Sequence, residues 1–78
     1  SPNPVENITS FEFNLIEEGN AKINIYNTTG ELVASFEDNY TAGMHNFYFD
    51  ATNLANGVYN VILCSGNQQV MTLMVVGK

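Results

Sequence analysis

Apolar and polar residues alternate with a period of two along most of this chain. In the segment Phe11–Leu15, for example, three apolar residues alternate with two polar ones. Successive side chains of a β-strand point to opposite faces, so this period predicts strands with one buried face. Five further segments are expected to be strands on the same or a related pattern, over residues 21–26, 32–36, 46–50, 59–64 and 70–76.

The last of these segments, Val70–Val76, differs from the others because it is apolar on both faces. Such a strand is expected either at the centre of its sheet or against something outside the domain that covers it. Its apolar faces would also support strand addition to a partner or to a second copy of the chain. Dimerisation through this strand is therefore one hypothesis from the sequence.

Polar turns separate the predicted strands, and no segment has the period of an amphipathic helix. Gly30 ends the turn Asn27–Gly30, where a left-handed bulge position would close a tight hairpin. A longer polar connection is expected over Asp38–Gly43. A short seventh strand could lie in Ala51–Leu54 or near Val5. These features predict an all-β fold, an antiparallel β-sandwich of six to seven strands.

The stretch Leu54–Tyr59 has the form L-x-x-G-x-Y at the start of an apolar strand. In immunoglobulin-like sandwiches, a tyrosine near the start of a late strand buries its ring and hydrogen-bonds the backbone a few residues upstream. Tyr59 is expected to take this corner role, with Leu54 closing the end of the core. Gly57 would adopt a backbone conformation that a residue with a Cβ rarely reaches. The motif therefore predicts that the sandwich is immunoglobulin-like.

The charge balance excludes several classes of partner. The 78 residues include eight acidic and only two basic side chains, which gives a net charge of −6. Nucleic acids and anionic membrane surfaces are bound by clustered lysine and arginine, so neither is an expected partner. No apolar run is long enough for a transmembrane helix, and no membrane insertion is expected.

Residues that carry catalysis or bind metals are scarce in this chain. It has one histidine, His45, and one cysteine, Cys64, which excludes a multi-histidine metal site and an internal disulfide. No motif of a serine nucleophile is present. Cys64 is expected to be a small buried hydrophobic residue. The sequence thus predicts a non-enzymatic protein without catalytic, cofactor-binding or metal-binding residues.

Three tyrosines support an alternative role in binding. They are expected on polar faces or loops of the sandwich and are Tyr26, Tyr40 and Tyr48. Aromatic rings combine a flat apolar face with a polar edge and can stack on sugar rings. The alternative function is therefore an accessory immunoglobulin-like or carbohydrate-binding module of an extracellular bacterial protein.

Five features follow one another in the order found in a known family. They are Pro2-Asn3-Pro4, the segment Ile23–Val33, Gly43 before a strand that ends in Phe49-Asp50, the Leu54–Tyr59 motif, and an apolar strand closed by Lys78. On these features the whole chain, residues 1–78 as one domain, resembles the C-terminal sorting domains of the type IX secretion system in Bacteroidota. The family usually has a lysine or arginine just before the last apolar strand, where this chain has Gln68-Gln69-Val70-Met71-Thr72 without a positive charge.

The resemblance implies an immunoglobulin-like domain at the end of a larger secreted protein, with a cargo domain N-terminal to it in the same chain. It implies export through the periplasm, recognition by outer-membrane secretion machinery and processing by a surface sorting peptidase. The protein would then be secreted or held at the cell surface. By the same resemblance, the candidates for recognition by the machinery are Val75, Val76 and Lys78. The motif residues, which are expected to be structural, are Pro2, Asn3, Pro4, Gly30, Gly43, Leu54, Gly57 and Tyr59.

Overall fold

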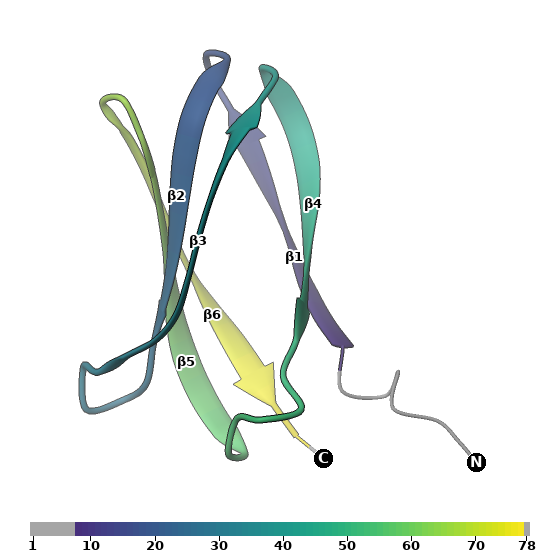
Figure 1. Cartoon of the computed structure of the whole chain (residues 1–78), viewed down its shortest axis with the longest axis vertical. Coiled ribbons are helices and arrows are strands. Elements are labelled where there is room, and N and C mark those ends of the chain that lie inside the picture. Colours follow the sequence, from purple (N-terminus) through teal and green to yellow (C-terminus); the bar gives the residue numbers. More distant parts are fainter. Residues whose placement is uncertain (1–7, 78) are drawn as a thin grey trace.

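The computed structural model describes residues 8–77, which form six β-strands and no helix (Figure 1). The bounds of the strands are β1 Ile8–Leu15, β2 Gly19–Tyr26, β3 Leu32–Tyr40, β4 Gly43–Asp50, β5 Gly57–Ser65 and β6 Gln68–Val76. In this part of the chain, no helix is present that is long and apolar enough to span a membrane.

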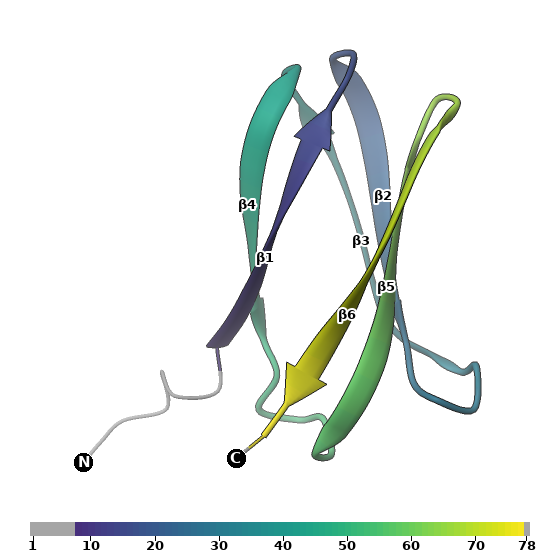
Figure 2. The same ribbon diagram turned by 180° about the vertical axis from the view of Figure 1, so that it is seen from behind.

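The strands form two sheets, one of two strands in the order β1-β4 and one of four strands in the order β3-β2-β5-β6. All four strand pairs are antiparallel. The two sheets face each other across the interior, and the view from behind shows β1 beside β6 (Figure 2). In immunoglobulin nomenclature the pair corresponds to strands B and E, and the larger sheet to C′, C, F and G. The predicted immunoglobulin-like antiparallel β-sandwich is therefore confirmed, with six strands in residues 8–77.

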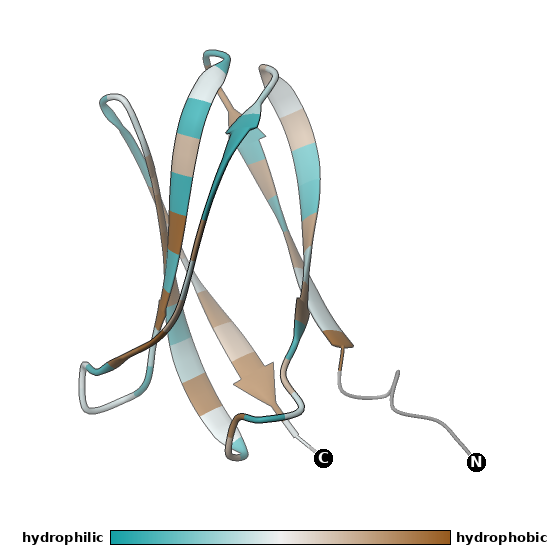
Figure 3. Ribbon diagram, viewed as in Figure 1, coloured by the Kyte–Doolittle hydropathy of each residue, from teal (hydrophilic) through white to brown (hydrophobic). Residues whose placement is uncertain are grey.

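The core is made by the inward-pointing residues of alternating strands, as the period of two predicts. In β2, Ile23 and Ile25 are almost completely buried, while Lys22 between the inward residues is exposed. Figure 3 shows this alternation as bands of hydrophobic and hydrophilic residues along the strands. The buried apolar residues are Phe13, Leu15, Ala21, Ile23, Ile25, Phe49, Ala51, Tyr59, Val61, Leu63, Met74 and Val76. Hydrophobic burial of this set is the main force that holds the two sheets together.

Two expected connections differ in the structure. The prediction of a long polar connection over Asp38–Gly43 is wrong, because β3 continues to Tyr40 and only residues 41–42 join it to β4. Pairing with β2 extends β3, since Asp38 and Tyr40 lie opposite Ala21 and Gly19. The prediction of a seventh strand in Ala51–Leu54 is also wrong. That segment is a turn, in which the Leu54 amide donates to the Ala51 carbonyl at 3.0 Å. The alternative near Val5 lies outside the described residues.

The outer strand β3 is less buried than its apolar pattern suggests. Leu32 is 53% exposed and Phe36 is 37% exposed. A register shift between Ile25 and Tyr26 ends the regular pairing near the start of β3. In addition, a two-stranded sheet faces a four-stranded one, so outer strands of the larger sheet are only partly covered. Phe36 still packs against Phe47 and Phe49, with ring centroids 5.1 and 5.5 Å apart.

Strand β6 is an edge strand of its sheet, so the expectation that it is central is wrong. Its inward residues Met74 and Val76 are buried. Its outward residues Met71, Leu73 and Val75 are 66%, 65% and 69% exposed. An apolar strand at a sheet edge therefore presents one apolar face to solvent, which leaves the expectation of an external cover open.

Candidate functional site

The corner before β5 has the geometry that the L-x-x-G-x-Y motif predicts. The Tyr59 ring is buried, and its hydroxyl donates a hydrogen bond to the Ala55 carbonyl at 2.5 Å. Gly57 has a φ of +153°, a value that residues with a Cβ rarely adopt. Leu54 is partly buried and packs against the core. This corner sets the point where the chain, having crossed from β4 in the smaller sheet, begins β5 in the larger one.

A second motif residue, Gly30, ends the β2–β3 turn at a φ of +90°. Its amide donates to the Asn27 carbonyl at 3.0 Å, and the Asn27 side-chain oxygen accepts from the amides of Thr29 and Glu31 at 3.1 and 2.9 Å. Asn27 thus stabilises the turn with both its backbone carbonyl and its side-chain oxygen. Gly43, with a φ of +113°, opens β4 opposite Leu15. Gly30 thus lies within the connection between β2 and β3, and Gly43 is the first residue of β4.

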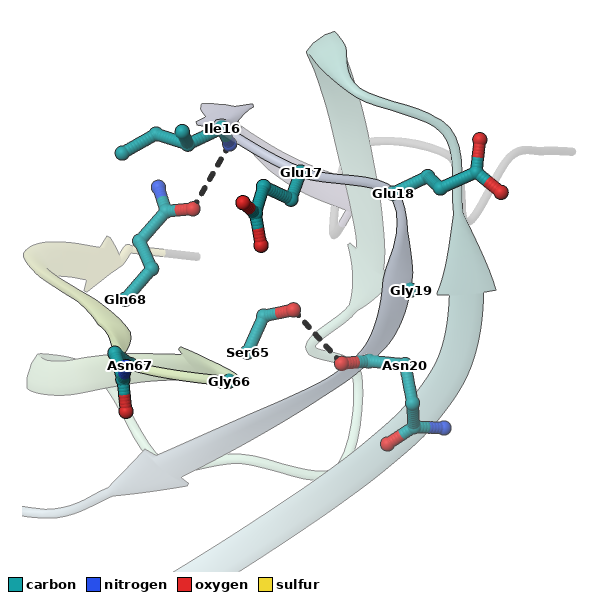
Figure 4. A pocket seen from close by; sticks show the side chains of 9 residues that line it. All are labelled: Ile16, Glu17, Glu18, Gly19, Asn20, Ser65, Gly66, Asn67 and Gln68. Carbon is teal, nitrogen blue, oxygen red and sulfur yellow. Dashed lines mark hydrogen bonds between the residues drawn. The ribbon is translucent and has the colours of Figure 1, made fainter.

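The C-terminal hairpin, β5 and β6 with their two-residue turn, is tied to the β1–β2 connection by polar side chains. The Gln68 side chain accepts a hydrogen bond from the Ile16 amide at 2.9 Å and donates to the Asn14 carbonyl at 2.6 Å. Ser65 donates from its hydroxyl to the Asn20 carbonyl at 2.8 Å. Figure 4 shows Gln68 and Ser65 reaching across to these segments.

The Gln68 amide bonds β1 as the peptide group of a neighbouring strand would. It accepts from the Ile16 amide and donates to the Asn14 carbonyl, and these two residues lie on either side of the last residue of β1. A neighbouring strand would hydrogen-bond two backbone groups with the same spacing. Sequence reasoning did not identify this role, because a polar residue at the start of a strand carries no signal for a bond to a segment about 50 positions away.

Residues 16–20 and 65–68 also line an open hollow of about 540 Å³ (Figure 4). Two of its polar side chains, Ser65 and Gln68, are engaged with the protein's own backbone. Within residues 8–77, no group of three histidine, cysteine or acidic side chains is placed to hold a metal ion. The hollow therefore lies between the β1–β2 connection and the turn of the C-terminal hairpin. Its described residues do not form a catalytic or metal-binding group.

The three tyrosines of the carbohydrate-binding alternative do not form one platform. Tyr26 lies on the outward side of β2, and Tyr48 is exposed on β4 in the other sheet. Tyr40 packs against Phe13 and His45, with ring centroids 5.2 and 5.0 Å apart. Burial raises the pKa of the Tyr40 hydroxyl, and the nearby Asp38 carboxylate adds to this shift. The structure thus separates the rings that a sugar would need side by side.

Cys64 is exposed on the outward side of β5, so the expectation of a buried cysteine is wrong. Because successive residues of a strand point to opposite faces, Cys64 points away from the core into which its neighbour Leu63 is buried, and no described strand covers that outward face. Of the candidates for recognition by the secretion machinery, Val75 is exposed and Val76 is buried. Lys78 and the motif residues Pro2, Asn3 and Pro4 lie outside the described residues.

Comparison with known proteins identifies a family for nearly the whole chain. The family model for the secretion system C-terminal sorting domain matches residues 2–77. No curated protein and no solved structure gives a significant match to this chain. The family is non-catalytic in general and acts as a sorting signal on a cargo protein, which implies export from the cell. The chain therefore belongs to the C-terminal sorting domains and is a sorting signal for type IX secretion.

Proposed function

We propose that the secretion machinery of the outer membrane recognises this domain through the end of its C-terminal hairpin. Val75 and Lys78 would make the direct contacts, and the buried Val76 would hold the strand in place. The observation that carries the proposal is the exposure of Val75, whose side chain is 69% exposed on the outward side of β6. Exposed apolar surface on a small domain marks a site of interaction.

The proposal extends to the fate of the protein. Residues 1–78 would act as a single domain that accompanies an N-terminal cargo domain through the periplasm and across the outer membrane. A surface sorting peptidase would then process the domain, leaving the cargo secreted or at the cell surface. The domain itself would have no enzymatic role. Family membership supports each of these steps.

The test is a fusion of a signal peptide, a fluorescent reporter and residues 1–78, expressed in a Bacteroidota host. We expect the reporter outside the cell or at its surface. If it stays in the periplasm while a known sorting domain exports the same reporter, the proposed function is wrong.

A matched pair of variants tests the recognition site within the same fusion. Val75→Glu places a charge on the exposed side of β6, whereas Met44→Glu places one at a position of β4 that is similarly exposed, at 63% against 69%. We expect the first variant to remain in the periplasm and the second to be exported. Equal export of both variants would show that the machinery does not contact Val75.

A further inference from the structure

The outward side of the C-terminal hairpin is mostly apolar, with Asn60 as a polar residue opposite Leu73 at its centre. Val58 lies opposite Val75, and Ile62 lies opposite Met71, with Leu73 between them on β6. Four of these side chains are among the exposed large hydrophobic residues of the protein, and Ile62 is partly exposed. These five residues, Val58, Ile62, Met71, Leu73 and Val75, make up what we call the apolar face. Contiguous exposed apolar surfaces on small soluble domains mark sites of interaction.

The apolar face is also the part of the molecule without charge. All eight acidic residues occur in the first 50 positions, and residues 51–77 contain no acidic or basic side chain. Both strands that carry the apolar face, β5 and β6, are therefore uncharged along their whole length. In a chain with a net charge of −6, two copies repel each other least when these surfaces meet.

We propose that a second copy of this chain covers the apolar face by packing its own apolar face against it. Two sheets stack face to face when their side chains are apolar and interdigitate, as in the interior of a sandwich. A two-fold axis brings the same surface from each copy together, so the contact is closed at two chains. The apolar face of a second copy is a suitable partner surface, because it is itself apolar and its strands carry no charge.

Contact through the face, rather than through the edge of β6, follows from the position of β1. The Gln68 side chain already bonds the β1 backbone at Asn14 and Ile16, and β1 runs beside β6 in the sandwich (Figure 2). A second four-stranded sheet that continued from the edge of β6 would meet β1. The outward side of the hairpin has no such neighbour among the described strands, so a stacked sheet can approach it.

Sedimentation or light scattering of the 78-residue chain, from micromolar to millimolar concentration, tests the proposal. We expect the average mass to rise toward twice the monomer mass and to stop there. Leu73→Glu, in the middle of the apolar face, should keep the protein monomeric over the whole range. Met44→Glu adds the same charge at a similarly exposed apolar residue of the other sheet and should dimerise like the unchanged chain. Circular dichroism and thermal melting show that both variants are folded.

A chain that stays monomeric at millimolar concentration would overturn the proposal without any bearing on export, which the reporter assay measures separately. Equal loss of dimer in Leu73→Glu and Met44→Glu would also overturn it, because added charge and not the apolar face would be responsible. Growth beyond two copies would exclude the closed two-fold contact. A dimer that Leu73→Glu breaks and Met44→Glu preserves supports the proposal.

Discussion

At the scale of single residues, Tyr59 connects burial with one hydrogen bond. Its ring fills part of the core while its hydroxyl lies at the corner and donates a hydrogen bond to the Ala55 carbonyl. A buried hydroxyl without a partner is costly, so the residue stabilises the corner only when both conditions are met. The positive φ of Gly57 brings the chain into the position where this bond can form.

Tyr59→Phe tests the contribution of that hydrogen bond. The variant keeps the ring and leaves the Ala55 carbonyl without its donor, so we expect a loss of about 1–3 kcal/mol in the free energy of unfolding. Urea denaturation measures the loss. Tyr48→Phe is the control, because Tyr48 is 68% exposed and its change should lie within about 0.5 kcal/mol. Identical midpoints for the Tyr59 variant and the unchanged chain would contradict the corner assignment.

At the scale of elements, the C-terminal hairpin is attached to the smaller sheet by few polar contacts. Gln68 provides two of them, both to backbone atoms next to the end of β1. Among the described strands, β1 pairs only with β4 and β6 only with β5, so Gln68 bridges the open side between the two sheets. This bridge positions β6, and therefore the exposed residues on which recognition and self-association are proposed to depend.

Gln68→Ala removes both bonds of the bridge. The groups are exposed to water, so we expect a loss of about 0.5–1.5 kcal/mol in unfolding free energy. Hydrogen exchange is the more specific measurement, and the Ile16 amide should exchange faster. Gln68→Glu should lose the bond to the Asn14 carbonyl, because an ionised carboxylate cannot donate. Gln69→Ala, at the exposed neighbouring position, should leave the Ile16 amide unchanged. Equal exchange in all variants would rule the bridge out.

At the scale of the whole molecule, the acidic charge opposes the compact state. Eight acidic and two basic side chains share a small surface, and their mutual repulsion is reduced when salt screens them. The same imbalance is uneven along the chain, because it leaves the last two strands uncharged. Repulsion between acidic side chains thus weakens the part of the fold formed by the first 50 residues, whereas the absence of charge on β5 and β6 permits close contact between molecules there.

Increasing sodium chloride should therefore raise the melting temperature, by about 2–6 °C for a domain of this size. The measurement is made at low protein concentration so that self-association does not contribute. The control replaces three exposed acidic residues, as Glu12→Gln, Glu17→Gln and Glu18→Gln, and changes the net charge from −6 to −3. Its melting temperature should respond less to salt. The same response in both proteins would show that repulsion is not the cause.

The local pattern was enough to predict the strands, their inward residues and the corner, whereas neighbour relations came from the fold. Period-two alternation depends only on the geometry of a strand, so the burial of Ile23 and the exposure of Lys22 could be predicted. The tyrosine corner is also local, because Tyr59 bonds a residue four positions away. The sequence could not show that β6 lies at an edge, that Cys64 is exposed or that Gln68 bonds β1. These depend on which strands become neighbours, and long-range packing of the two sheets decides that.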